Sequence, residues 1–165
     1  MQSGISIDEI SKIIIEGLRV HIIHDSKDVV FVDKLKNKLK EKDLQVTTSY
    51  DVDSPSGNEG MEQQMDMVRQ AGECGTNIVV LSKNSVHSDI VKNAVNAAFA
   101  YDSRLMAVNI DGVELEGELK FYLYTNQWLS PGTPIKDEND LDSFVENVVN
   151  EIEYFFKKEE ELRGV

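Results

Sequence analysis

The sequence has a single cysteine, three prolines and no hydrophobic run long enough to cross a membrane in its 165 residues. One cysteine, Cys74, excludes an internal disulfide, and a chain without disulfides fits the reducing cytoplasm. The isoleucine-rich N-terminal segment carries Asp8, Glu9 and Glu16, and these charges interrupt any signal-peptide or membrane-spanning pattern. We therefore expect a cytoplasmic protein without a membrane partner.

Positive charge is also scarce, since 17 Lys and Arg against 30 Asp and Glu give a net charge of −13. This balance disfavours nucleic acids and anionic membrane surfaces as partners, because both require clustered Lys and Arg. The sequence has neither a phosphate-binding loop with its lysine nor a Gly-x-Gly-x-x-Gly run, which argues against a nucleoside triphosphatase and a Rossmann domain. His21 and His87 are not spaced as metal ligands, so we predict no metal site.

Strand-like and helical segments alternate along the chain. The segments rich in β-branched or apolar residues are 19–23, 44–49, 77–82 and 105–110, and a short edge strand is expected near Trp128. Hydrophobic residues at helical spacing lie between these segments. This order predicts an α/β fold, a flavodoxin-like doubly wound parallel sheet of about five strands with helices on both faces.

The expected organisation is an N-terminal helix, a core and a C-terminal helix that packs on or extends from the core, over residues 1–18, 19–135 and 136–165. In the first segment Ser6 and Glu9 have the spacing of a capping box. Apolar residues follow at helical intervals, namely Ile10, Ile13, Ile14 and Leu18. Asp140 is expected to cap the last helix.

Polar loops follow the first three predicted strands. Their sequences are HDSKD (24–28), YDVDSPSGNEG (50–60) and SKNSVHS (82–88). In a doubly wound sheet, ligands bind beyond the carboxyl ends of the strands, where the strand order reverses. We therefore expect a ligand site where these loops meet.

Two stretches of the sequence resemble bacterial TIR (Toll/interleukin-1 receptor) domains. The opening of such a domain is similar to HDSKDVVFVDKLKNKLKEKDLQV, and its third strand and following helix are similar to IVVLSKNSVHSDIVKNAVNAAFA. The matching positions in the second stretch include Leu81, Ser82, Asn84 and Ser88, whereas Ile90 and Val91 stand where Trp-Cys is common in the family. Trp128 resembles the family's late aromatic box.

The resemblance implies the TIR fold and, as in enzymatic members, cleavage of the nicotinamide–ribose bond of NAD+. The products would be nicotinamide and ADP-ribose or a cyclic variant, and NAD+ would be a substrate, with no prosthetic group. The resemblance also implies TIR–TIR homo-oligomers and a role in bacterial immune, anti-phage signalling. At the helix position where enzymatic members carry a glutamate, this chain has Ala94. A carboxylate there would stabilise an oxocarbenium-like ribose, and alanine cannot.

Ala94 has two interpretations. On pattern alone it belongs to a stripe that predicts an ordinary core face, formed by Ile90, Ala94, Ala97 and Tyr101. The resemblance instead makes it the position of a missing catalytic group, either in a natural non-catalytic adaptor or in an enzyme altered by a Glu→Ala substitution. The polar loops favour the altered enzyme. Asp89 does not replace the glutamate, because it lies about 140° around the helix from position 94.

The resemblance implies that the loops around position 94 contact the nucleotide. The expected substrate-binding residues are His24, Asp25, Ser26, Lys27, Tyr50, Asp51, Ser82, Asn84, Ser88, Ile90 and Val91. Local roles compete with ligand contact at several of these positions. Asp25 and Ser26 are equally suited to cap the next helix, of which Asp28 is the expected N-cap, and Ser88 is the expected cap of the helix that it precedes.

Two further hypotheses stand beside the inactivated NAD+ glycohydrolase. One is a non-enzymatic TIR interaction module that acts by TIR–TIR assembly, for which the loop 50–60 would supply contacts. The other is a flavodoxin-like receiver or flavin protein. Receivers need an acidic pair at the end of the first strand and an aspartate at the end of the third. The third strand ends in Leu81-Ser82, which disfavours a receiver.

Overall fold

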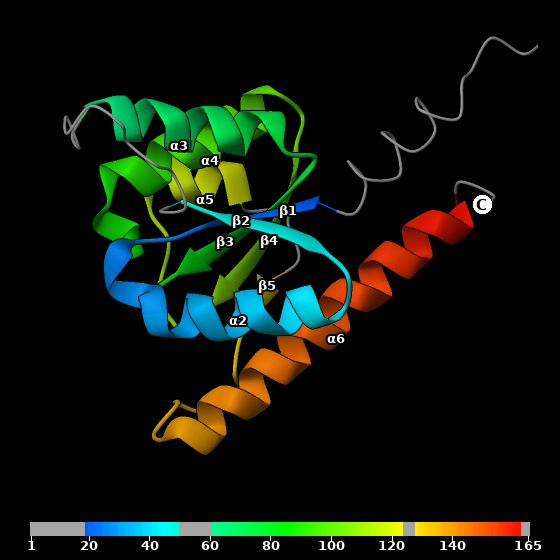
Figure 1. Cartoon of the computed structure of the whole chain (residues 1–165). Coiled ribbons are helices and arrows are strands. Elements are labelled where there is room, and N and C mark those ends of the chain that lie inside the picture. Colours follow the sequence, from blue (N-terminus) through cyan, green and yellow to red (C-terminus); the bar gives the residue numbers. More distant parts are fainter. Residues whose placement is uncertain (1–18, 50–60, 124–127, 163–165) are drawn as a thin grey trace, which may run out of the picture.

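The computed structural model describes residues 19–49, 61–123 and 128–162. Its centre is a parallel sheet with the strand order β2-β1-β3-β4-β5 (Figure 1). The strands are β1 (Arg19–Ile23), β2 (Gln45–Thr48), β3 (Thr76–Leu81), β4 (Arg104–Asn109) and β5 (Trp128–Leu129). The predicted α/β fold with a doubly wound parallel sheet is therefore confirmed.

Helices cover both faces of the sheet. They are α2 (Val29–Glu41), α3 (Met61–Glu73), α4 (Asp89–Ala100), α5 (Gly117–Leu123) and α6 (Glu138–Leu162), with short 3₁₀ turns η1 (Ser26–Asp28) and η2 (Ser85–His87). Figure 1 shows α2 and α6 on one face of the sheet and α3, α4 and α5 on the other. The central strand β3 is buried along its whole length, as its continuous apolar sequence predicts.

Two buried clusters hold these layers together. Because side chains alternate along a strand, Ile78 and Val80 of β3 pack toward α2 and α6, while Val79 and Leu81 pack toward α4 and α5. The second cluster also contains Ile23, the last residue of β1. The end of β1 and the end of β3 therefore share one apolar layer with α4.

The long helix α6 is attached to the core by an apolar stripe. Its buried residues recur at helical spacing, namely Phe144, Val145, Val148, Val149, Ile152 and Phe156. The Phe144 ring stacks on Phe31 of α2 with 5.9 Å between the ring centroids. The part of α6 from Phe144 to Phe156 thus packs on the sheet and on α2.

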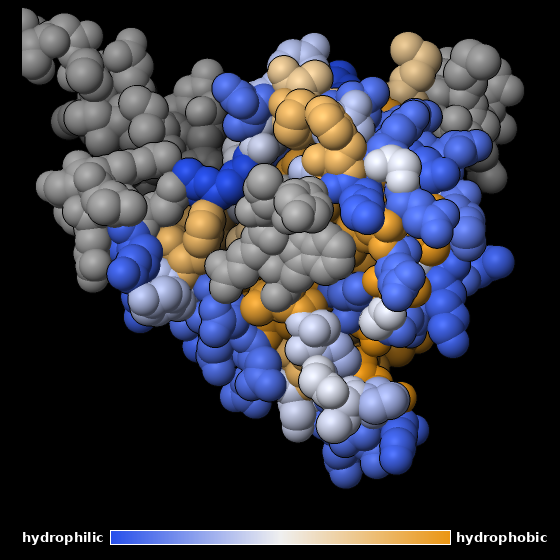
Figure 2. All heavy atoms as spheres, turned by 180° about the vertical axis from the view of Figure 1, so that it is seen from behind, coloured by the Kyte–Doolittle hydropathy of each residue, from blue (hydrophilic) through white to orange (hydrophobic). Residues whose placement is uncertain are grey.

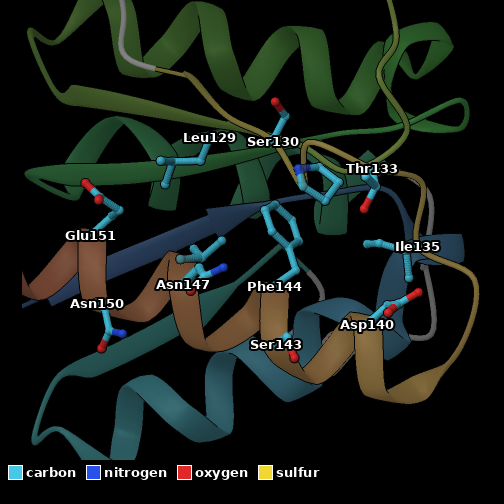
Figure 3. Close-up of a pocket in the computed structure, with 12 residues that line it drawn as sticks. Leu129, Ser130, Thr133, Ile135, Asp140, Ser143, Phe144, Asn147, Asn150 and Glu151 are labelled. Atoms are coloured by element: carbon cyan, nitrogen blue, oxygen red, sulfur yellow. The ribbon is translucent and has the colours of Figure 1, made fainter.

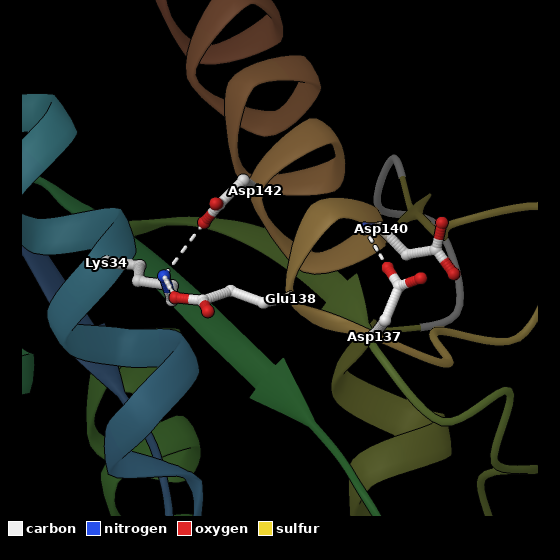
Figure 4. A network of polar contacts seen from close by, with 5 residues as sticks. All are labelled: Lys34, Asp137, Glu138, Asp140 and Asp142. Carbon is white, nitrogen blue, oxygen red and sulfur yellow. Dashed lines mark hydrogen bonds and ion pairs between the residues drawn. The ribbon is translucent and has the colours of Figure 1, made fainter.

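Ion pairs flank this apolar contact (Figure 4). The Lys34 ammonium lies 2.8 Å from the Asp142 carboxylate and 3.1 Å from that of Glu138. Its hydrogen bonds, first to Asp142 and then to Glu138, raise the pKa of Lys34, so the ammonium stays charged at neutral pH. Exposed pairs of this kind contribute little to stability, so burial of the α6 stripe carries the attachment.

The start of α6 differs from the prediction that Asp140 caps it. The helix begins at Glu138, and the Asp137 carboxylate accepts a hydrogen bond from the backbone N–H of Asp140 at 2.8 Å. Asp140 lies inside the first turn and accepts a hydrogen bond from the N–H of Lys136 at 3.1 Å. The two carboxylates therefore act reciprocally, with Asp137 as the cap.

The N-terminal helix and membrane-spanning segments are the last two features of the fold to compare with the sequence. The N-terminal helix predicted for residues 1–18 lies outside the described residues. Among the residues that are described, no helix has the length and apolar character needed to pass through a bilayer.

Replacing Phe144 with alanine tests the attachment of α6. The side chain is 5% exposed and stacked on Phe31, so we expect Phe144→Ala to lower the free energy of unfolding by about 3–5 kcal/mol. The matched control is Tyr154→Ala on the same helix, where the ring is 59% exposed. Urea denaturation followed by circular dichroism measures both. Equal losses in the two variants would contradict an apolar attachment.

Candidate ligand site at the strand ends

The strand order reverses between β1 and β3, and this is where the candidate site lies. β1 pairs with β2 on one side and with β3 on the other, all in parallel, so the chain leaves neighbouring strands at one edge of the sheet. The loop after β1 (24–28) and the loop after β3 (82–88) therefore meet there, as the sequence predicts. The third expected contributor, the loop 50–60 with Tyr50 and Asp51, lies outside the described residues.

The buried carboxylate of Asp28 joins these two loops. It accepts hydrogen bonds from the Ser82 hydroxyl at 2.5 Å and from the Asn84 side-chain amide at 3.1 Å. Ser82 Oγ in turn accepts hydrogen bonds from the backbone N–H groups of Asn84 and Ser85, at 3.1 and 3.0 Å. A carboxylate that is only 8% exposed requires such donors, because burying it unpaired is costly.

Asp28 is the residue whose role the sequence analysis missed. It occupies the N-cap position of α2, as predicted, but its side chain makes no hydrogen bond to that helix. Its partners are 54 and 56 residues away in the chain. The sequence could have indicated this role, because an acidic residue on the loop after β1 faces a loop after β3 that carries two polar residues, Ser82 and Asn84.

In the loop after β1, two of the polar side chains make hydrogen bonds within the loop itself. The ring of His24 is buried, with Nδ1 2.8 Å from the carbonyl oxygen of Asp25. Asp25 is half-buried and accepts a hydrogen bond from the N–H of Lys27 at 2.9 Å, so it caps the 3₁₀ turn η1 rather than the helix α2. Ser26 and Lys27 are exposed. Of the four predicted contacts on this loop, these two are the most accessible to a ligand.

The loop after β3 is built in a similar way. Ser82 is fully buried and Asn84 is half-buried in the network around Asp28. The Ser88 hydroxyl accepts a hydrogen bond from the N–H of Val91 at 3.3 Å, which confirms its role as the cap of α4. Ile90 is half-buried and Val91 is buried. Of the predicted contact residues on this loop, Asn84 and Ser88 are the polar ones that reach solvent.

Ala94 lies on the buried face of α4. Its side chain is 1% exposed, in the cluster that also contains Ile23 and Leu81. The predicted core stripe is out of phase, because the buried residues of α4 are Val91, Ala94, Val95 and Ala98. Tyr101, which the predicted stripe included, is 75% exposed. Ala94 is thus a core residue one turn into α4, in the same layer as the ends of β1 and β3.

A cavity of about 960 Å³ opens beside the loop after β3. It lies between the start of α4 and the segment 113–119, and both Lys83 and Lys92 line it. The backbone N–H of Lys83 donates to the Asp111 carboxylate at 2.8 Å, which fixes the base of the loop. The lining also includes four carboxylates, those of Asp89, Glu114, Glu116 and Glu118, so Lys83 and Lys92 are the groups in this cavity that would attract a phosphate.

A second cavity, of about 620 Å³, lies between α6 and the segment 129–135 (Figure 3). Asp140 and Glu151 point toward it together with neutral side chains such as Ser143 and Asn147. Its lining has carboxylates and no Lys or Arg, which does not suit a pyrophosphate. Within the described part of the chain, no group of three His, Cys, Asp or Glu side chains is placed to hold a metal ion.

Comparison with known proteins places the chain in a family. Residues 20–146 match the profile of the TIR domain. Among solved structures, the TIR domain of the Toll-related receptor TRR-2 from the lower metazoan Hydra magnipapillata is similar, with 17% identity, a TM-score of 0.56, and coverage of 81% of this chain and 97% of that one. A phosphoheptose isomerase from Francisella tularensis is similar at 14% identity and a TM-score of 0.54, covering 85% and 76%. No curated protein sequence matches. At these identities the structural likeness shows the fold alone.

Replacing Asp28 with asparagine tests the link between the loops. Asparagine keeps the size but loses the charge and one acceptor, so we expect Asp28→Asn to lower the free energy of unfolding by about 1–3 kcal/mol. Asp25→Asn is the matched control, since its amide oxygen can still accept the N–H of Lys27, and we expect a change within about 0.5 kcal/mol. Urea denaturation measures both. An Asp28→Asn variant as stable as the control would refute the link.

Proposed function

This chain belongs to the TIR domain family, and from that premise we propose that its strand-end site binds NAD+ or a related ADP-ribose nucleotide without cutting it. Cleavage of the nicotinamide–ribose bond, in this proposal, depends on a carboxylate at position 94, where the chain has alanine. The natural setting is TIR signalling in bacterial immune defence, in the cytoplasm, with TIR–TIR homo-oligomers as the assembled form.

The placement of position 94 is the observation that carries this proposal. Ala94 is one turn into α4 and shares a buried layer with Ile23 and Leu81, the last residues of β1 and β3. The residues that follow those two strand ends form the polar edge of the sheet, where doubly wound folds bind their ligands. A side chain longer than alanine at position 94 would start from the same buried layer as the two strand ends.

The chemistry explains why one carboxylate would decide between binding and cutting. When the bond between ribose C1′ and the nicotinamide nitrogen breaks, its electron pair leaves with neutral nicotinamide and the ribose becomes oxocarbenium-like. A negative group beside the ribose stabilises that charge, and water then adds at C1′ and loses a proton to give ADP-ribose. The Ala94 methyl has neither charge nor hydrogen-bond acceptor, so the chain as given lacks this stabilisation.

The binding groups that we assign are the accessible ones of the two loops and of the first turn of α4. Lys27, Lys83 and Lys92 are the cations available to the pyrophosphate, and the α4 N-terminus presents backbone N–H groups to the same region. Ser26, Asn84 and Ser88 are the polar candidates for the ribose hydroxyls. The buried groups His24 and Ser82 would keep the loops in shape rather than contact the ligand.

A second candidate function is a TIR module that acts through assembly alone. It is favoured by exposed aromatic side chains on α4 and α5, where Phe99 is 48% and Phe121 is 72% exposed. Both rings pack against Tyr122, with centroids 4.7 and 5.3 Å away. Figure 2 shows hydrophobic atoms at the surface among hydrophilic ones on the side opposite to the view of Figure 1. Exposed aromatic side chains that contact one another, as Phe99 and Phe121 do with 6.1 Å between their ring centroids, are typical of protein–protein contacts.

Restoring a carboxylate at position 94 tests the proposal. We expect Ala94→Glu to release nicotinamide from NAD+, whereas Ala94→Gln, which has the same size without the charge, should be slower by at least about a hundredfold. Nicotinamide release is followed by chromatography at low and high protein concentration, because assembly is part of the proposal.

Burial of position 94 requires a folding control, since the methyl is 1% exposed and a longer side chain must be accommodated. Circular dichroism and thermal unfolding of the Glu and Gln variants supply it. Folded Ala94→Glu protein that releases no nicotinamide at any concentration would contradict the catalytic proposal and favour the assembly module.

A further inference from the structure

An apolar groove runs between α3 and α4 on the outer side of their layer. Its volume is about 640 Å³, and its apolar walls include Met65 and Val68 of α3, Ala97 and Ala100 of α4, and Tyr101. Met65 is 65% and Tyr101 75% exposed. Large apolar side chains left open along a groove are costly in water unless another segment covers them.

The N-terminal segment of the chain enters the fold at one end of this groove. Arg19 opens β1, and its carbonyl oxygen lies 3.7 Å from the Sγ of Cys74. Cys74 directly follows Glu73, the last residue of α3, which lines the groove. Residues 1–18 therefore join the described fold beside the C-terminal end of the groove.

The composition of that segment matches such a groove. It has apolar side chains on one helical face, at Ile10, Ile13, Ile14 and Leu18, and a capping-box spacing at Ser6 and Glu9. Gly17 is the residue type that ends helices and lets the chain turn into the strand that follows. A helix from Ser6 to Glu16 is about 15 Å long, and α3 from Met65 to Glu73 is about 12 Å long, so the lengths correspond.

We propose that residues 6–16 form an amphipathic helix whose isoleucine face docks into the α3–α4 groove of the same chain. The short connection to β1 favours this groove over any surface on the α2–α6 side, because the effective concentration of a tethered segment is highest near its attachment. This inference is independent of nucleotide binding.

Engineered cysteines in the 165-residue chain test the docking. The pair Ile14→Cys and Ala97→Cys places one thiol on the proposed helix face and one in the groove. The native Cys74 does not interfere, because it is buried and burial raises the pKa of its thiol, which stays protonated and slow to react at neutral pH. We expect an intramolecular disulfide on mild oxidation, seen as a faster-migrating monomer on non-reducing gels.

The matched control is Ile14→Cys with Asn37→Cys, because Asn37 is exposed on α2 at the opposite face of the sheet. The groove pair should oxidise at least about tenfold faster than this control. Equal rates for the two pairs would overturn the proposal. Disulfide-linked dimers in place of monomers would also overturn it, because they would mean that the segment binds a second copy.

Hydrogen exchange measured by mass spectrometry gives an independent readout. Changing Ile10 and Ile14 to serine should speed amide exchange at the end of α3 and at the end of α4, where the groove lies. Ile15→Ser is the control, because Ile15 lies about 100° around a helix from Ile14 and off the proposed face. Unchanged exchange in the Ile10→Ser/Ile14→Ser variant would refute the docking.

Discussion

The candidate site depends on one buried carboxylate, which joins the loops that follow β1 and β3. Asp28 sits after β1, and its hydrogen bonds to Ser82 and Asn84 hold the loop after β3 in place. These loops leave β1 and β3, which pair side by side in the sheet, and the contacts of Asp28 join the loops beyond the ends of the two strands. Because Asp28 is almost fully buried, breaking either contact would leave its carboxylate with one donor fewer and without water to replace it, and this cost holds the loops together.

That constraint separates the structural residues of the site from the residues that could meet a ligand. The side chains of His24 and Ser82 are buried inside the loops, whereas those of Lys27 and Lys83 are exposed. Position 94 belongs to neither set, because it lies in the buried apolar cluster between α4 and the sheet. The scaffold is thus complete without a carboxylate at position 94, which is why the same fold could serve a nucleotide-cutting enzyme or a signalling module.

The sequence predicted features whose causes are local. The apolar run of β3, the strand near Trp128 and the cap at Ser88 are all set by neighbouring residues, and each was found in the expected place. The missed features depend on residues far apart in the chain. For Asp28 the sequence predicted the N-cap position, but it did not predict the side-chain hydrogen bonds, because their partners lie on another loop. Tyr101 was placed in the core because the helical pattern of α4 fits two phases, and only packing on the sheet selects one.

The most direct test of the account is a titration of the chain with ADP-ribose, followed by NMR of its backbone amides. ADP-ribose needs no cleavage, so the result does not depend on the residue at position 94. The account predicts chemical-shift changes that cluster in residues 25–28 and 82–92, at the two loops joined by Asp28. Shift changes confined to the cavity between α6 and segment 129–135, or no saturable changes at all, would contradict it.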